Sequence, residues 1–372
     1  MSLDRLRAHR RALHQIPERG LLEFKTKAYL LSVLEPLGPD RLDQLGDTAL
    51  RAVFFCGRPG AKTLAFRADM DALPVREETG LPFCSGHEGF MHACGHDGHM
   101  ALLLTFCEYV AAHREELGCN VVALFQPGEE NYLGARDFVR LGALEAPRVD
   151  EVYGGHLMPS LPLGSVGLSA GPVMAGNLSI ALRVRGVSAH GASPQNGVDG
   201  VLAACQALVA IQAALSRLDP TKPCLASFGS IHGGSVRNAL AEEVVADGVM
   251  RYYDQAHRDA MLRTMERAAQ GAAGALGATA ELWRDEKESP PVINDEACVR
   301  KAAALLEGRV AQTAQMISED FSCYLNQRPG CFAFIGCGQE GRTSPLHSSR
   351  FDFDEAALLP MLQLYIRLSR QA

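Results

Sequence analysis

Side chains that commonly bind metal ions are concentrated in one segment, Phe66 to Ala101, which contains four of the twelve histidines of the chain. The same segment contains Cys94 in C-x-H and two aspartates in D-M-D. An extended backbone would send Cys94 and His96 to the same side, because such a chain has a period of two. Thiolate and imidazole suit Zn²⁺ or a similar transition ion. The segment therefore predicts a metal site, although C-x-H alone more often marks a buried thiol beside a surface histidine.

Further candidate ligands follow predicted strands. Each of three strands is followed by acidic or imidazole side chains: Asp69 and Asp71 after 63–66, Glu129 and Glu130 after 120–126, and His156 after 151–155. In an open α/β sheet, functional sites gather beyond the carboxyl ends of the strands. We therefore expect these side chains to meet at one edge of a sheet.

The adjacent Glu129 and Glu130 allow a division of labour. One carboxylate can bind a metal ion, while the other takes a proton from water and returns it to a departing amine. This is chemistry that hydrolyses an amide. Two other interpretations remain open: the pair could only complement a helix dipole, or Cys94 could be a nucleophile served by His96 and Asp71. The thiol mechanism would leave the glutamate pair and His156 without a role.

The elements that must position these residues are those of an α/β protein. Strands alternate with helices up to Gly176, which predicts a mostly parallel sheet with helices on both faces. The order then becomes β-α-β-β-α-β, the ferredoxin-like arrangement, and the α/β pattern returns after Pro290-Pro291. We expect a catalytic domain formed by residues 1–176 and 291–372, interrupted by an inserted domain of residues 177–290.

Composition excludes several classes of partner. The 372 residues are 47% hydrophobic, with a net charge of −7 and no long basic run, so we expect no binding to nucleic acid or anionic membranes. No apolar run approaches the roughly 20 residues of a membrane helix. The N-terminus is charged and amphipathic, unlike a signal peptide. Eleven scattered cysteines fit reduced thiols in the cytoplasm better than a disulfide framework.

Motifs along nearly the whole chain resemble the M20 metallopeptidase family, in its amidohydrolase and aminoacylase branch, subfamily D. They are R-R-A-L-H-Q-I-P-E at 10–18, R-A-D-M-D-A-L-P at 67–74, M-H-A-C-G-H-D-G-H at 91–99, Q-P-G-E-E at 126–130, G-G-H-L-M-P at 154–159, S-A-H-G-A-S-P at 188–194, S-E-D-F at 318–321 and P-L-H-S at 345–348. So many motifs in the same order make the resemblance specific. It implies a metal-binding catalytic domain interrupted by a dimerisation or lid domain.

The resemblance also implies roles for individual residues. It implies two divalent metal ions per subunit, Zn, Mn or Co, held by Cys94, His96, Glu130, His156 and His347. Glu129 would be the general acid and base. Asp71 would orient a metal-binding group without binding the metal ion itself. His347 is supported only by the P-L-H-S motif, because it lies about 190 residues after His156.

Substrate binding is implied for the inserted domain. His190, Asn238 and Arg251 match positions that bind the substrate carbonyl and carboxylate, and in many relatives that histidine serves the partner subunit, so we expect a homodimer. The chain departs from common family patterns at Gln195, at Asn131-Tyr132-Leu133 and at Asn238-Ala239-Leu240-Ala241. These departures leave the metal chemistry unchanged but affect the expected substrate specificity.

Two stretches, at 14–31 and 87–101, are most similar to the N-acetyldiaminopimelate deacetylases of bacterial lysine synthesis. The expected substrate is therefore a small N-acyl, in particular N-acetyl, amino acid. Within the same class the alternative is a broader N-acyl-amino-acid or hippurate hydrolase. From another class, a catalytically silent metal-binding dimer remains open, although the intact Glu129 argues against it.

Overall fold

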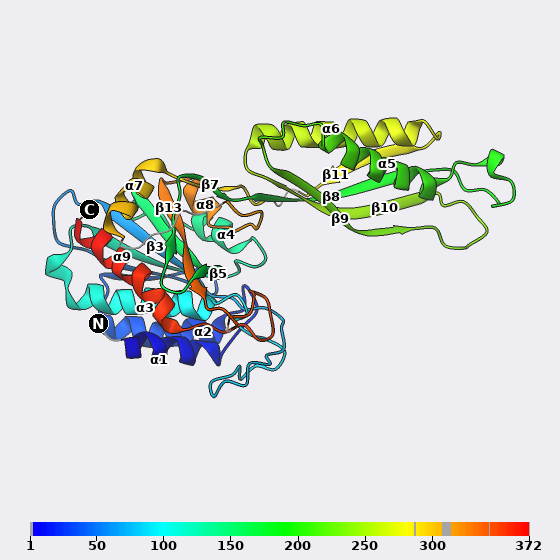
Figure 1. The fold of residues 1–372 in the computed structure, drawn as a ribbon. Helices are drawn as coiled ribbons and strands as arrows, with labels where there is room; N and C mark the ends of the chain where they lie inside the picture. The colour runs from blue at the N-terminus through cyan, green and yellow to red at the C-terminus, as the bar shows by residue number, and fades with distance from the viewer. Residues whose placement is uncertain (1–2, 286–287, 307–313, 342, 372) are drawn as a thin grey trace. The chain divides into compact units, whose positions relative to one another are not determined.

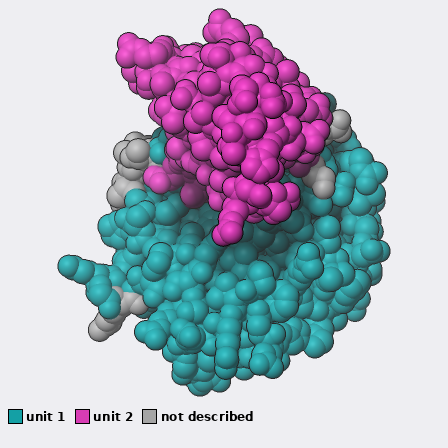
Figure 2. All heavy atoms as spheres, turned by 90° about the vertical axis from the view of Figure 1, so that its right-hand side faces the viewer, with its two compact units in different colours: residues 1–173, 292–314, 320–372 teal, residues 174–291, 315–319 magenta. Residues whose placement is uncertain are grey.

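The computed structural model describes residues 3–285, 288–306, 314–341 and 343–371 of the chain. These residues form two compact units, which Figures 1 and 2 show. Unit 1 comprises residues 1–173, 292–314 and 320–372, and unit 2 comprises residues 174–291 and 315–319. Residues 315–319 join unit 2 through a β-bridge between Met174 and Gln315.

Unit 1 contains a seven-stranded sheet in the order β1-β2-β4-β3-β5-β13-β6. Its strands are β1 (Arg41–Leu45), β2 (Ala49–Phe54), β3 (Thr63–Asp69), β4 (Asn120–Gln126), β5 (Glu151–Pro162), β6 (Val166–Gly167) and β13 (Gly330–Gly338), and a separate pair is formed by β7 (Gly171–Met174) and β12 (Val292–Asn294). The four central strands, β4, β3, β5 and β13, run parallel to one another. Strands β2 and β6 pair antiparallel with β4 and β13, and the edge strand β1 pairs antiparallel with β2.

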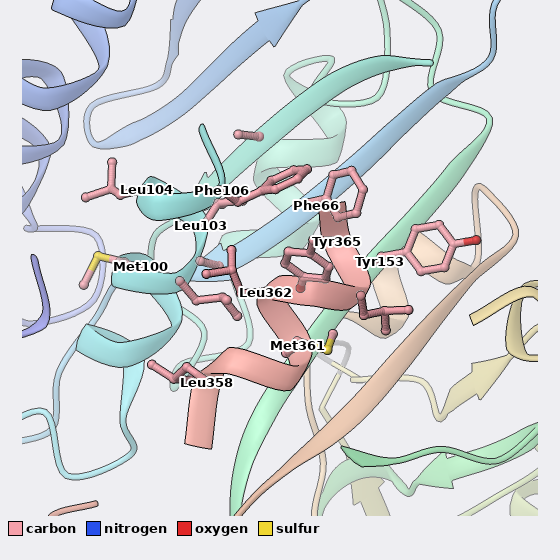
Figure 3. Packing of buried hydrophobic residues seen from close by; sticks show 14 of the residues in the cluster. Phe66, Met100, Leu103, Leu104, Phe106, Tyr153, Leu358, Met361, Leu362 and Tyr365 are labelled. Atoms are coloured by element: carbon pink, nitrogen blue, oxygen red, sulfur yellow. The ribbon is translucent and has the colours of Figure 1, made fainter. Parts of the chain in front are cut away.

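Helices cover both faces of this sheet (Figure 1). They are α1 (Leu3–His14), α2 (Phe24–Leu34), η1 (Glu35–Leu37), α3 (His96–Ala112), η2 (Arg114–Glu116), α4 (Gly134–Arg140), α7 (Glu296–Leu305), α8 (Ser322–Leu325), η4 (Glu355–Leu358) and α9 (Leu359–Gln371). Every residue of β3 is buried, as a parallel strand between two helical layers should be. Figure 3 shows the core between β3, α3 and α9, where Phe66 lies 4.7 Å from the ring of Phe106 and 4.6 Å from that of Tyr365.

Unit 2 is an antiparallel sheet with the strand order β11-β8-β10-β9, and two helices cover one of its faces (Figure 1). Its elements are β8 (Gly176–Arg185), η3 (Pro194–Asn196), α5 (Gly200–Leu215), β9 (Cys224–Gly233), β10 (Glu243–Tyr252), α6 (Gln255–Gly274) and β11 (Thr279–Arg284). A core of its own, with Ile180, Ile211 and Met261 all at most 2% exposed, fills the space between sheet and helices.

The expected fold class is confirmed: a mixed α/β sheet interrupted by a ferredoxin-like βαββαβ unit. The structure separates unit 2 from unit 1 near residues 174 and 291. The assignment of 1–176 and 291–372 as a catalytic domain and of 177–290 as an inserted domain stays a prediction. Strands β1 and β2, which extend the sheet beyond β4 because β2 pairs antiparallel with β4 and β1 with β2, were not expected from the sequence. No helix in the described part of the chain is long and apolar enough to span a bilayer.

Buried charges connect α1 to the first turn of α3. The carboxylate of Asp97 accepts a hydrogen bond from Arg10 Nε at 3.2 Å and lies 2.8 Å from His14 Nδ1, while His14 Nε2 lies 3.3 Å from Glu77 Oε1. Burial by itself lowers the pKa of His14, but the carboxylates of Asp97 and Glu77 outweigh burial and raise that pKa to about 9. Protonated His14 is therefore part of the native packing of α1.

This pKa predicts a pH dependence of stability. The folded-state pKa of His14 lies above the unfolded value of about 6.5, so its contribution is complete below pH ~6.5 and is lost as the pH rises toward about 9. We expect His14→Gln to lower the free energy of unfolding more at pH 6 than at pH 9.5, measured by urea denaturation. His232→Gln, at an exposed position, should show no such difference. An equal loss for His14→Gln at both pH values would contradict the assignment.

Candidate metal centre

His156 is positioned by the divergence of two parallel strands. Strand β5 pairs with β3 only as far as Phe66 opposite Tyr153, but it continues to pair with β13, where His156 lies opposite Phe334. The expectation that this strand ends before His156 was therefore wrong. Because β3 no longer covers it, this part of β5 faces the side chains that arrive after β3 and β4.

Cys94 and His96 are brought together by a left-handed turn, and the expected extended backbone was wrong. Gly95 has φ +86° and is the N-cap of α3, so His96 begins the helix and Asp97 lies in its first turn. Glycine suits this position because it adopts positive φ without strain. A Cβ on Gly95 would also lie only 2.6 Å from a methyl group of Leu157.

His347 reaches the site from the far end of the chain. Its backbone N–H donates to the carbonyl oxygen of Ala93 at 2.8 Å, directly before Cys94, and its φ is +64°. Its imidazole Nε2 lies 3.3 Å from Cys94 Sγ and 3.5 Å from a carboxylate oxygen of Glu130. The His347 side chain is 55% exposed, so the site opens to solvent on this side.

The five expected ligands all lie together. Cys94 Sγ is 3.3 Å from His156 Nε2 as well as from His347 Nε2, and one ligand atom each from Cys94, His96 and Glu130 lie within 4.8 Å of one another. His96 Nε2 is buried and has no hydrogen-bond partner among the described residues. A cation coordinated by sulfur, nitrogen and carboxylate oxygen would satisfy this atom, so the donor set fits a transition metal or zinc.

The charges around the site also fit a cation. Burial lowers the pKa of His96, but the carboxylates of Asp69, Asp71 and Glu130 outweigh burial and raise it to about 10. Burial and the carboxylates of Glu130 and Glu129 raise the pKa of the Cys94 thiol well above its ordinary value. A nucleophilic cysteine requires the opposite shift. The thiol-enzyme interpretation is therefore disfavoured, whereas a bound divalent ion would favour the thiolate.

Asp71 holds the loop that carries the two glutamates. Its Oδ1 accepts from the backbone N–H of Glu129 and its Oδ2 from that of Glu130, both at 3.0 Å. The backbone carbonyl of Asp71 lies 2.9 Å from His96 Nδ1 and fixes that ring. Asp71 is 1% exposed and Glu129 6%, so both carboxylates are withdrawn from bulk water. The structure thus brings Glu129 and Asp71 to the edge of the sheet where Glu130 and the other candidate ligands lie.

His99 lies beside the candidate ligands, but both of its ring nitrogens form hydrogen bonds within the protein. The N–H of Leu157 donates to His99 Nε2 at 3.0 Å, so that nitrogen carries a lone pair. His99 Nδ1 therefore carries the proton and donates to Asp69 Oδ1 at 2.7 Å. Both ring nitrogens are used, and the ring supports the part of β5 that follows His156.

Other supporting residues were named only as parts of motifs. Arg67 donates to Asp69 at 2.8 Å and to Asp320 at 2.9 Å, and Asp320 also accepts from Gln126 and from the backbone N–H of Ala135. These buried charges explain why the motifs R-A-D-M-D and S-E-D-F contain charged residues. The charged side chains join the ends of β3 and β4 to a segment that lies far along the chain. Sequence spacing gave no signal for these pairings.

Unit 2 places two of the three expected substrate-binding residues side by side. His190 forms a β-bridge with Ala239, and the N–H of Gly191 donates to the carbonyl oxygen of Asn238 at 2.7 Å. His190 and Asn238 are exposed. Arg251 lies at the other end of β10, half-buried, with its guanidinium donating to Ser318 Oγ.

The chain is similar in sequence to known proteins over most of its length. The family model described as peptidase family M20/M25/M40 matches residues 65–371. The chain is 34% identical to N-acetyldiaminopimelate deacetylase of Leuconostoc citreum over 371 residues, covering 97% of this chain and 94% of the relative. It is 36% identical to N-acetyl-L-cysteine deacetylase of Bacillus subtilis, covering 94% and 84%.

A solved structure shows the same architecture. A dinuclear metal-binding peptidase of the M20 family from Bacillus subtilis matches with a TM-score of 0.87 at 29% identity, over 100% of this chain and 99% of that one. The family predicted from the motifs is thereby confirmed, and with it the prediction of a hydrolase that acts on amide bonds. The chain belongs to peptidase family M20/M25/M40.

Proposed function

We propose that this protein is a metal-dependent amidohydrolase that removes a small acyl group, in particular acetyl, from an N-acyl amino acid. The observation that carries the proposal is the convergence of Cys94, Glu130 and two histidines around His96 Nε2, a buried atom that has no hydrogen-bond partner among the described residues. The charge of Glu129 also acts on Cys94. Cys94, His96, Glu130, His156 and His347 would hold two divalent ions, Zn, Mn or Co.

The roles of the residues follow from what each can do at neutral pH. When bound, the ions supply Lewis-acid activation of the scissile carbonyl and of the attacking water. Glu129 takes the proton of that water and delivers it to the departing amine nitrogen. Asp71 holds Glu129 and Glu130 through their backbone N–H groups. Arg251 binds the substrate carboxylate in two parallel hydrogen bonds, and His190 donates to the developing oxyanion.

The acyl preference is a separate prediction. Two relatives more than 30% identical are named as deacetylases, one for N-acetyldiaminopimelate and one for N-acetyl-L-cysteine. We expect kcat/KM for N-acetyl-diaminopimelate or another N-acetyl amino acid to exceed that for hippurate by at least about tenfold, which corresponds to about 1.4 kcal/mol. The measurement is a substrate series with metal-reconstituted enzyme. A preference for hippurate would instead support the broader hydrolase.

A homodimer is supported by the separation of the substrate-binding residues within unit 2. Arg251 and the His190–Asn238 pair lie at opposite ends of β10, and residues 243–251 of that strand span about 26 Å at about 3.3 Å per residue. An N-acetyl amino acid is much shorter than this distance. One copy of unit 2 therefore cannot present both ends to one substrate, whereas two copies related by a two-fold axis can. We propose that His190 acts on the partner's site.

Mixing two inactive variants tests this arrangement. His190→Ala and Glu129→Gln homodimers should each be inactive, and subunit exchange between them should restore up to about a quarter of wild-type activity, because one hybrid site has both residues intact. The control mixes Glu129→Gln with Glu130→Gln, which damage the same half-site and should give no recovery. Confirmed exchange by mass spectrometry with no recovered activity would exclude a role for His190 in trans.

We also propose that the enzyme works in the cytoplasm on a small-molecule substrate. None of the eleven cysteines, all of which lie in the described residues, forms a disulfide, which fits a reducing compartment.

A further inference from the structure

Glu23 is a buried acid that has no part in the mechanism above. It is the N-cap residue of α2, yet its side chain does not cap that helix. The Glu18 carboxylate does so instead, because it accepts from the backbone N–H groups of Lys25 and Thr26 at 3.2 and 2.9 Å. Glu23, which is 0% exposed, is therefore available for another contact.

The Glu23 carboxylate joins three segments of unit 1. Its Oε1 accepts from the N–H groups of Leu21 and Gly128, and its Oε2 accepts from Thr48 Oγ1, each at 2.9 Å. Gly128 directly precedes Glu129 and has φ +62°. A Cβ at Gly128 would lie 2.9 Å from the Leu21 side chain, so the two segments also pack closely.

Two buried acids thus hold three consecutive N–H groups of the loop after β4. Glu23 accepts from Gly128, and Asp71 accepts from Glu129 and Glu130. The direction of each N–H fixes a peptide plane, and the peptide planes fix where the following side chains point. Reorienting the Gly128 amide would therefore turn the Glu129 and Glu130 carboxylates.

The burial of Glu23 and Asp71 close to each other is unfavourable for folding. Burial and the nearby charge of Asp71 raise the pKa of Glu23 to about 7. A raised carboxyl pKa means that the ionised acid lowers folding stability as the pH rises through that value. Functional sites are one place where burial and like charges shift the pKa of an acid in this way.

We propose that Glu23 is a positioning residue, which sets the orientation of Glu129 and Glu130 through the amide of Gly128. The proposal rests on the function proposed above for those two glutamates. It attributes the effect to the reach of the Glu23 side chain rather than to its charge.

Two substitutions separate reach from charge. Glu23→Gln keeps the length: its amide oxygen can accept from both N–H groups, and the Thr48 hydroxyl can turn to accept from the amide nitrogen. Glu23→Asp keeps the charge but is one methylene shorter, so its carboxylate cannot reach Gly128. Glu151→Asp is the control, because Glu151 is another buried carboxylate with several donors, Lys62, Lys301 and Tyr153, at the start of β5.

Three quantities are measured for each variant: deuterium exchange of a peptide covering residues 127–131, affinity for added Mn²⁺ or Zn²⁺, and kcat. For Glu23→Asp we expect faster deuterium exchange of this peptide. We also expect metal affinity to fall by about 10–100-fold, as it does when other groups that orient a metal ligand are lost. The value of kcat should fall by a similar factor. Glu23→Gln should stay within about threefold of wild type in all three. Glu151→Asp should change only the melting temperature.

Wild-type behaviour of Glu23→Asp, or equal losses in Glu23→Gln and Glu23→Asp, would overturn the proposal. Equal losses of kcat in Glu23→Asp and Glu151→Asp would also overturn it, because general destabilisation would then account for the effect. If wild type hydrolyses no N-acyl amino acid, the proposed function fails, while exchange and metal affinity still decide the role of Glu23.

Discussion

Glu129→Gln is expected to lower kcat by about 10²–10⁴-fold and to leave metal content unchanged, because it removes the proton acceptor and no ligand. The substitution conserves shape, and Asp71 binds the backbone N–H of residue 129 rather than its side chain. The loop should therefore keep its conformation. Single-turnover kinetics and elemental analysis of the purified variant measure the two effects separately.

Glu130→Gln is the matched variant for this prediction. Its carboxylate lies with Cys94 and His96 among the candidate ligands, so its loss should weaken metal binding by at least about tenfold. Added metal should restore part of its activity but none of the activity of Glu129→Gln. If both variants bind metal normally and turn over at near wild-type rate, the pair is only a complement to a helix dipole.

Removal of metal is expected to abolish turnover, and Mn²⁺ or Zn²⁺ should restore it. Binding should also stabilise the fold, because an ion that binds only the native state adds about 2.7 kcal/mol at a free concentration of 100 Kd. The measurements are activity and thermal unfolding of chelator-treated protein, with the metal content verified by elemental analysis.

His96→Ala provides the control for chelation, because it removes a completely buried candidate ligand. Its melting temperature should respond to neither chelator nor added metal. Full activity in wild-type protein shown to be free of metal would end the metal-dependent interpretation. Loss of stability without loss of activity would make the ions structural.

The loop that follows the glutamate pair departs from the common family pattern. Asn131 and Tyr132 follow the glutamate pair, and Tyr132 has φ +57°, an uncommon conformation for a bulky residue. These positions continue the loop that Glu23 and Asp71 hold. Substitutions there are therefore expected to change kcat/KM between acyl groups more than metal affinity.

The sequence by itself determined the family, the fold class and the local units of the site. Strand 120–126 was located correctly because its apolar run is bounded by polar and Pro-Gly signals, and such signals are local. The expectation that acids after β3 and β4 would meet at one edge follows from parallel strands alone. His347 came only from a motif, since no periodicity connects it to residues about 190 positions away.

Only the tertiary structure decided how these units fit together. It showed that β5 continues past His156 because it pairs with β13, that Gly95 turns the chain left-handed, and that His99 has both nitrogens engaged. Glu23 is the clearest case, because its position marks it as the N-cap of a helix, whereas its carboxylate binds an amide 105 residues later. Sequence patterns record which face of an element is buried. The partner of a buried polar group depends on strand order and loop path, which bring distant segments together and leave no local pattern.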